Sequence, residues 1–237
     1  MKTKQPIYFM LWLLLFPILQ VEAQTVNYGA WNSFLKKHVN SYGEVNYQAI
    51  KTDQKSLVVS LETFMKNEPN ETWSKNETLA YWINAYNAFT IKLISDNYPI
   101  KSIKDIKNPW DLEFIQIGNK NLSLNEIEHD ILRKLSEPRI HFAIVCASKS
   151  CPKLLNEAYI PSKLDLQLTV ATEEFLSDKS RNSISQEHLK LSKIFKWFTG
   201  DFTQNGSLID FLNLYTDVKI SQKAKKTYND YSWELNE

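Results

Sequence analysis

The apolar run from residue 142 to residue 145 is the most strand-like stretch of the chain. Consecutive apolar side chains without polar alternation are typical of a strand that is buried on both faces. Small and polar residues follow at once and lead to Pro152, which indicates a tight loop. The pattern therefore predicts a central strand that opens into a loop carrying Cys146 and Cys151, the 2 cysteines of the chain.

A long helix is predicted from residue 75 onward. Ser74 and Glu77 have the spacing of a capping box, in which each residue's side chain accepts a hydrogen bond from the other's backbone N–H. Residues 79–91 are apolar around almost the whole circumference, as in a helix enclosed by the protein. We expect this helix to end before Pro99.

Asn84 and Asn87 interrupt the apolar surface of this helix and share one face, because they are three residues apart. A buried amide without a partner destabilises a protein by about 1–3 kcal/mol, so both side chains need partners. They either bind neighbouring backbone groups and hold the helix in place, or orient groups in a functional site. The pattern leaves both interpretations open.

The rest of the chain mixes helices with short strand pairs. Helices are predicted over residues 25–39, after residues 45–47 as far as 65, and over 161–176, 194–198 and 208–215, with hairpins over 113–117 with 121–124 and 183–185 with 188–191. A second capping box, Ser123 with Glu126, begins a helix with Glu128 and His129 in its first turns. We predict one α+β domain over residues 24–237, with a buried central helix packed on a small, mainly antiparallel sheet.

The N-terminal segment has the pattern of a signal peptide over residues 1–23. Residues 1–4 are basic, residues 7–19 are largely apolar, and residues 21–23 fit the small-x-small cleavage rule. We expect cleavage after Ala23 and export to the periplasm or the extracellular space. A membrane anchor is the alternative, but the apolar run is shorter than the roughly 20 residues that cross a bilayer. No integral membrane segment is expected after removal of the signal.

Charge excludes two classes of partner. The chain of 237 residues has a formal net charge of +1, and its basic residues are scattered. Binding to nucleic acid or to an anionic membrane surface needs a clustered basic patch, so we expect neither. A small-molecule or peptide ligand stays open. The sequence indicates no cofactor and does not set the oligomeric state.

Cys151 and His141 are the candidates for a nucleophilic site. A cysteine nucleophile needs an imidazole that takes its proton and a third group that orients the imidazole, for which Asn84 or Asn87 is of the right type. On a regular strand His141 and Cys146 point to opposite faces. The loop can return Cys151 toward the strand, so we expect Cys151 to pair with His141 and to be alkylated faster than a buried Cys146.

Two other interpretations of these side chains stay open. In an oxidising compartment Cys146 and Cys151 can form a disulfide that fixes the shape of the loop. Together with His129 and His141 they are also potential metal ligands, although their spacing matches no zinc pattern and we predict no metal.

Several segments, in this order, resemble the family known as domain of unknown function 547. They are residues 42–47, 81–91, 124–133, 139–152 and 231–236. The resemblance covers most of the mature chain, and Asn46 departs from the aspartate expected in many members. The activity of the family is unknown.

That family looks distantly similar to papain-like and transglutaminase-like folds, in which a buried helix carries the nucleophilic cysteine and a histidine opens a later strand. Here the helix has Asn84 and Asn87 where those enzymes need a thiol. The resemblance therefore implies that the nucleophile moved to Cys151 or that the chemistry was lost.

Two functions follow from these observations. The first is a cysteine-dependent hydrolase or acyltransferase that acts on amide bonds, with Cys151, His141, Asn84 and Asn87 in the catalytic site. The second is a non-catalytic binding domain on a degenerate papain-like fold, with a disulfide between the two cysteines. The candidate binding residues are Glu128, His129, Ser148 and Lys149.

Overall fold

The computed structural model describes residues 26–237. The signal peptide predicted for residues 1–23 lies outside the described residues. The helices are α1 (Gly29–His38), α2 (Tyr47–Thr52), α3 (Gln54–Met65), α4 (Lys75–Asn97), α5 (Leu164–Ser177), α6 (Ile194–Trp197), α7 (Thr199–Phe202) and α8 (Leu208–Asn213), with a π-helix, η2 (Glu126–Leu132), and the 3-10 helices η1 (Ile103–Asp105), η3 (Arg133–Leu135), η4 (Pro138–Phe142) and η5 (Pro161–Lys163). The strands are β1 (Ile115–Ile117), β2 (Lys120–Leu122), β3 (Ser183–Ile184), β4 (His188–Leu191) and β5 (Lys225–Tyr228).

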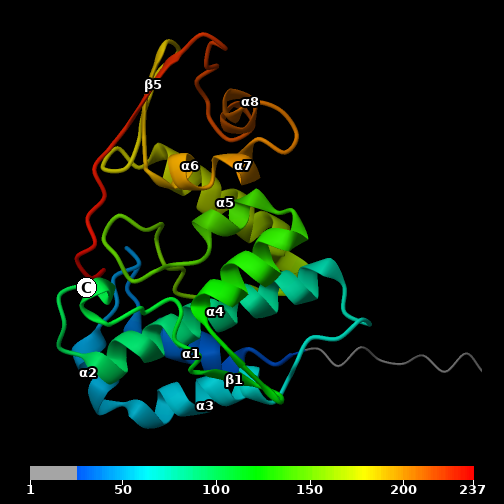
Figure 1. The fold of residues 1–237 in the computed structure, drawn as a ribbon, viewed down its shortest axis with the longest axis vertical. Coiled ribbons are helices and arrows are strands. Elements are labelled where there is room, and N and C mark those ends of the chain that lie inside the picture. The colour runs from blue at the N-terminus through cyan, green and yellow to red at the C-terminus, as the bar shows by residue number, and fades with distance from the viewer. Residues whose placement is uncertain (1–25) are drawn as a thin grey trace, which may run out of the picture.

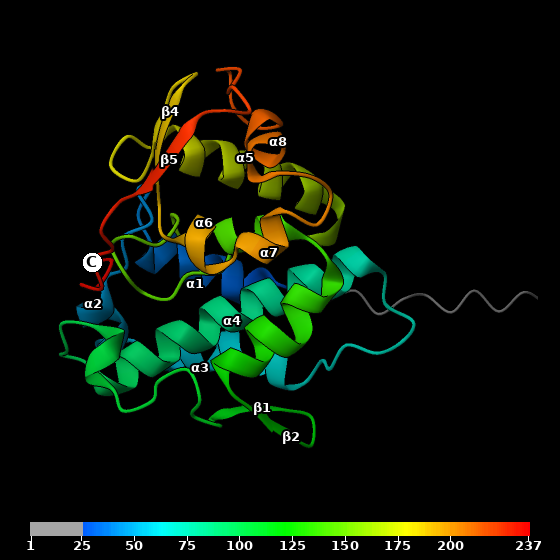
Figure 2. The same ribbon diagram turned by 45° about the horizontal axis from the view of Figure 1, so that its top comes forward.

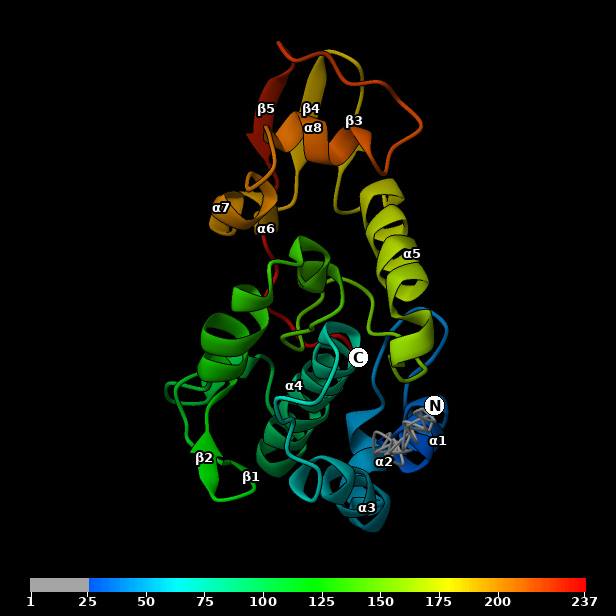
Figure 3. The same cartoon turned by 90° about the vertical axis from the view of Figure 1, so that its right-hand side faces the viewer.

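The elements form two lobes that meet beside α4 (Figures 1 and 3). One lobe holds α1 to α4 with the β1–β2 hairpin, and the other holds α6 to α8 with the sheet β3–β4–β5, while α5 runs along one side of both (Figure 3). The last residues return from β5 to the first lobe, where Leu235 pairs with Ser148 and Glu234 with Ser102. The C-terminal tail therefore ties the second lobe to the first (Figure 2).

Helix α4 is the centre of the first lobe. The predicted capping box is confirmed, because Ser74 N donates to Glu77 Oε2 at 2.7 Å and Glu77 N donates to Ser74 Oγ at 3.2 Å. The side chains from Leu79 to Ile91 are all buried, and the main neighbours of the helix are α2, α3 and η2. The α+β class is confirmed, but the central helix is enclosed mostly by helices and loops.

Both predicted hairpins are confirmed as antiparallel pairs, β1 with β2 and β3 with β4. Gly118, in the first turn, has a φ of +57°, which glycine adopts without steric strain. Strand β5 was not predicted. It pairs in parallel with β4, and its four residues, Lys-Lys-Thr-Tyr, lack apolar alternation because none of them is fully buried.

The prediction of a central strand over residues 142–145 is wrong. The chain there leaves η4, and Ala143 N and Ile144 N both donate to Ile140 O, at 2.8 and 2.9 Å. The next backbone groups are bound by a side chain of α4: Asn87 Nδ2 donates to Ala143 O, and Val145 N donates to Asn87 Oδ1, each at 2.9 Å. The run is apolar because it is buried, and one amide replaces the strand partner that burial would otherwise require.

Asn84 has a similar role on the preceding turn of α4. Its Nδ2 donates to Tyr159 O at 2.7 Å, and its Oδ1 accepts from Tyr159 N at 3.0 Å and from Trp31 Nε1 at 3.1 Å. The two amides thus bind backbone groups and hold neighbouring segments against the helix, which is the first of the two interpretations that the sequence left open.

Phe142 joins the two hydrophobic clusters. Residues 143–145 belong to the cluster around α4, whereas the ring of Phe142 packs in the second cluster. Its centroid lies 5.1 Å from that of Phe175, 5.7 Å from that of Phe195 and 5.6 Å from that of Phe202. Because adjacent residues belong to different clusters, the segment just before Cys146 is fixed from both sides.

We predict that Asn87→Leu lowers the free energy of unfolding by about 1–3 kcal/mol, because Ala143 O and Val145 N lose their partner in a buried site. Asn76→Leu, at an exposed position of the same helix, is the control and should have little effect. Urea unfolding of both variants tests this. Equal stabilities would show that the Asn87 amide does not hold the segment.

Candidate functional site

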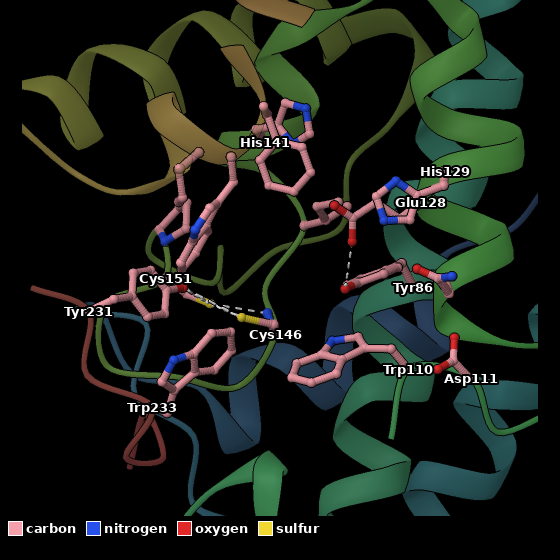
Figure 4. A pocket seen from close by; sticks show the side chains of 16 residues that line it. Tyr86, Trp110, Asp111, Glu128, His129, His141, Cys146, Cys151, Tyr231 and Trp233 are labelled. Carbon is pink, nitrogen blue, oxygen red and sulfur yellow. Dashed lines mark hydrogen bonds between the residues drawn. The ribbon is translucent and has the colours of Figure 1, made fainter. Parts of the chain in front are cut away.

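A cavity of about 430 Å³ lies where the two lobes meet. Its lining comes from α4, η2 and η4, from the cysteine loop, from α6 with the residue that follows it, and from the C-terminal tail. Seen from close by, Cys146, Cys151 and Tyr231 lie on one side and Glu128, His129 and Tyr86 on the other (Figure 4). His141 lies above the space between them in this view, and Trp110 and Trp233 lie below it.

The sulfur of Cys151 is surrounded by hydrogen-bond donors. Cys146 N, Ser148 Oγ and Tyr231 Oη each lie 3.2 Å from Cys151 Sγ. The loop brings Cys146 N and Ser148 Oγ to the sulfur because Ala147, in the left-handed region with a φ of +60°, turns the chain back after Cys146, whereas Tyr231 comes from the C-terminal tail. This arrangement favours a thiolate, since hydrogen bonds to the charged form stabilise it.

The two sulfurs lie 2.7 Å apart, and both cysteines are free. An S–S bond is about 2.03–2.05 Å long. The disulfide expected between Cys146 and Cys151 is therefore not formed in this structure. The sequence placed the two residues correctly in one tight loop, but it did not show that the donors around Cys151 would favour a charged sulfur.

The two thiols differ in acidity. Burial raises the pKa of Cys151, but hydrogen bonds from Cys146, Ser148 and Tyr231 outweigh it and lower the pKa to about 6. The contact with Cys151, and then burial, raises the pKa of Cys146 well above its ordinary value. Near neutral pH, Cys151 is the thiolate and Cys146 the thiol beside it.

The expected exposures of the cysteines are reversed. Cys151 is 2% exposed, whereas Cys146 is half-buried. The expectation that Cys146 is buried on a strand is wrong because that strand does not exist. Exposure therefore favours alkylation of Cys146 and acidity favours alkylation of Cys151, so the expected order of labelling stays a prediction.

His141 lines the cavity but does not bind a cysteine. Its Nε2 donates to Asp201 Oδ2 at 2.7 Å, and its ring stacks on Phe198 with centroids 3.9 Å apart. Asp201 also accepts two hydrogen bonds from Arg133, from Nε at 2.6 Å and from Nη2 at 2.9 Å. Within residues 26–237 no hydrogen bond joins His141 to Cys146 or Cys151, so the expected direct pair is absent.

Charge at this pair is set by burial and by Arg133. Burial lowers the pKa of His141 more than Asp201 raises it, so the imidazole is neutral at physiological pH. Burial raises the pKa of Asp201, but hydrogen bonds from His141 and Arg133 outweigh it and hold the pKa below its usual range. The result is a neutral imidazole that is oriented by an ionised carboxylate. A carboxylate in this position is the kind of third group that a nucleophilic triad uses to orient its histidine.

Glu128 is the carboxyl on the far side from the cysteines. Its Oε2 accepts from Tyr86 Oη at 3.2 Å, and burial raises its pKa to about 7. The capping box that begins this segment is confirmed, since Ser123 N donates to Glu126 Oε2 at 2.7 Å. The helix that follows is a π-helix, a form found often at functional sites.

Aromatic rings form the remaining wall. The ring of Trp233 lies with its centroid 5.5 Å from Trp110, 5.9 Å from Trp197 and 4.8 Å from Tyr231. Trp197 is 46% exposed, and Lys104 Nζ lies 4.0 Å from the centroid of the Trp233 ring. Such partly exposed rings offer a surface on which an apolar or planar group of a ligand can stack.

The predicted site residues separate into two groups. Cys151, His141, Glu128 and His129 line the cavity. Ser148 does not line it, but its Oγ donates a hydrogen bond to Cys151 Sγ. Asn84, Asn87 and Lys149 do not line it: the amides bind backbone groups, and Lys149 lies on the surface, where its Nζ is 2.9 Å from Glu234 Oε2.

Sequence reasoning missed Asp201 and Tyr231 as site residues. Asp201 lies in a two-turn segment rich in aromatic residues, where a single carboxylate next to buried rings was the available signal. Tyr231 opens the last segment that resembles the domain of unknown function 547 family, so that resemblance pointed to its neighbourhood without giving it a role.

The comparisons with known proteins bear on the central part of this site. Residues 70–176 match the family model described as "Protein of unknown function, DUF547". The predicted resemblance to this family is confirmed over these residues. The match includes α4, η2 and the cysteine loop, whereas Asp201 and Tyr231 lie outside it. No curated protein and no solved structure matches the chain, and the papain-like outline stays a prediction.

Two further findings concern the described part of the chain. Among residues 26–237, no group of three or more His, Cys, Asp or Glu side chains is placed to hold a metal ion. No helix in that range is long and apolar enough to cross a membrane.

We predict that Tyr231→Phe raises the pKa of Cys151 by about one to two pH units, because a hydrogen bond to a charged group contributes about 1.5–3 kcal/mol. Thiolate forms as pH rises through the pKa, so alkylation of wild-type Cys151 by iodoacetamide should rise through about pH 6. In the variant this rise should move to higher pH. Peptide mapping after timed labelling measures it.

Tyr228→Phe is the matched control, since this half-buried tyrosine three residues earlier has no hydrogen bond to either sulfur. The same pH profile in wild type and Tyr231→Phe would show that the Tyr231 hydroxyl does not stabilise the thiolate.

Proposed function

We propose that the protein is a cysteine-dependent hydrolase or acyltransferase that acts on amide bonds. The supporting observation is the sulfur of Cys151, which lines a cavity and accepts from three donors that lower its pKa to about 6. A thiolate is the reactive form of cysteine, and one present at neutral pH needs no separate base to remove its proton.

The reaction begins with attack of Cys151 Sγ on an acyl carbon of a ligand held in the cavity. The leaving group departs with a proton, and the acyl group remains on sulfur as a thioester. A hydrolase then passes the acyl group to water, and an acyltransferase passes it to another acceptor. His141, which is neutral and oriented by Asp201, lines the same cavity and is a base of suitable type for that second step.

Cys146 has a different role from Cys151 in this proposal. Its backbone N–H and its thiol both face Cys151 Sγ, at 3.2 and 2.7 Å. Because the contact with Cys151 raises its own pKa, Cys146 stays protonated and supports the charge on its neighbour. Replacing its side chain leaves the backbone donor in place.

A non-catalytic binding site is the second candidate. It is favoured by the wall of partly exposed aromatic rings and by the hydrogen bond that directs His141 to Asp201 in place of a cysteine. Such a site needs the shape of the cavity but no reactive thiolate, so the two candidates differ in whether Cys151 becomes acylated.

We predict that p-nitrophenyl acetate acetylates Cys151 of the wild-type protein and of Cys146→Ser, and leaves Cys151→Ser unmodified. Intact mass after acid quenching, followed by peptide mapping, locates the acetyl group. His141→Ala should slow release of the acetyl group by about 10²–10⁴-fold, the usual contribution of a general base. Acetylation at Cys146 alone, or at neither cysteine, would favour the binding site over the catalytic one.

A further inference from the structure

Glu128 is a partly buried carboxyl group to which the proposed thiol chemistry gives no role so far. Its side chain reaches the cavity from η2, on the side away from Cys151 (Figure 4). Within residues 26–237 its one hydrogen-bond partner is Tyr86 Oη, and no Lys, Arg or His lies within ion-pair distance of it. A desolvated carboxyl without a cation is costly to ionise, so its position across the cavity from a reactive thiol indicates a use for its proton.

The charges around Glu128 keep both of its protonation states within reach. Burial is the main cause that raises the pKa to about 7; the hydrogen bond from Tyr86 and the charge of Arg133 oppose it, while Cys151 and Asp201 add to it. The other titratable groups that line the cavity are His129 on the same helix, neutral His141 on η4, Asp111, Cys146 and Tyr231. Near neutral pH the carboxyl can therefore give up a proton and take one back.

His141 is less suited to give a proton to a leaving group. Its Nε2 already donates to Asp201, and burial keeps the ring neutral at physiological pH. Cys146 keeps its proton because it faces the sulfur of Cys151. Glu128 is a cavity carboxyl that is partly protonated near neutral pH and has no cationic partner among the described residues.

We propose that Glu128 protonates the leaving nitrogen when the amide bond breaks, with Tyr86 as the positioning residue that holds its carboxyl. This inference rests on the proposed function, because it needs the thioester on Cys151.

The two half-reactions balance. In the first, the Cys151 thiolate forms an S–C bond with the acyl carbon, the C–N bond breaks, and the amine leaves with the proton of Glu128, which becomes a carboxylate. In the second, His141 takes a proton from water while the water oxygen bonds to the acyl carbon. The C–S bond then breaks, which releases a carboxylic acid and restores the thiolate. The proton on His141 passes through solvent to the carboxylate, which restores the protonated Glu128.

A proton from Glu128 narrows the expected substrate class to amides. An amide, whose nitrogen is a poor leaving group until it is protonated, needs Glu128. An activated ester, whose phenolate leaves without a proton, does not need it for the first half-reaction. The pair p-nitrophenyl acetate and p-nitroacetanilide carries the same acyl group and differs in this requirement.

The test compares wild type, Glu128→Gln and Tyr86→Phe, with Asp130→Asn as the control. Asp130 is an exposed neighbour on the same helix, 3.1 Å from Lys134 Nζ. Glu128→Gln should lose about 10²–10⁴-fold in cleavage of the anilide. It should keep the wild-type rate at which the ester acetylates Cys151, and Asp130→Asn should match wild type on both substrates.

The pH profile separates a proton donor from a structural residue. Anilide cleavage by wild type should rise as Cys151 ionises through about pH 6 and fall as Glu128 ionises through about pH 7. Tyr86→Phe removes a hydrogen bond that lowers the pKa of Glu128, so its falling limb should move to higher pH. Infrared difference spectra between wild type and Glu128→Gln report the protonated carboxyl directly, without any substrate.

An infrared signal of protonated Glu128 that disappears near pH 7, together with selective loss of anilide cleavage, supports the inference. A carboxyl that is ionised throughout, undiminished anilide cleavage in Glu128→Gln, or ester acetylation without anilide cleavage in wild type overturns it while leaving the thiol function in place. No acetylation of wild-type Cys151 overturns the thiol function and the role of Glu128 with it.

Discussion

The hydrogen bonds of the Asn87 amide are the interaction on which the site depends. Residues 143–145 are buried and have no strand beside them, so their polar backbone groups need another partner. Asn87 supplies both a donor and an acceptor to them from the most enclosed helix of the protein. An amide can do this where an ionised carboxylate cannot, because the amide presents both an N–H donor and a C=O acceptor whereas the carboxylate only accepts. Cys146 follows Val145 directly, so the hydrogen bond from Val145 N to Asn87 also fixes where Cys146 begins.

The two lobes meet at the point that this interaction fixes. Phe142 packs among the rings of the second cluster, and the residues after it pack around α4. The tail returns from β5 to pair with Ser148, which brings Tyr231 to the sulfur of Cys151. The thiolate therefore takes its donors from both the loop and the tail, and it is more stable when the tail is in place. The pairing of the C-terminal tail with the first lobe therefore affects the pKa of Cys151.

Local signals predicted the elements well and the site in part. The capping boxes at Ser74 and Ser123, the enclosed α4 and both hairpins follow from spacing and periodicity, which act within a few residues. The strand at 142–145 was wrong because an apolar run shows burial and not which group satisfies the backbone. Asp201 and Tyr231 were missed because their contacts with His141 and Cys151 span 60 and 80 positions. No local pattern carries that information.

Two acids on different elements, the cysteine loop and η2, reach the cavity in different charge states. Cys151 is held ionised by donors, and burial keeps Glu128 partly protonated near neutral pH, so the group that is less acidic by ordinary values carries more of the charge. Each state favours the other, since the negative sulfur raises the pKa of the carboxyl. Such groups titrate as a pair, and the proton lies on the carboxyl because no donors but Tyr86 reach it among the described residues. Because the two acids lie on separate elements, Cys151 can have three hydrogen-bond donors while Glu128 has one.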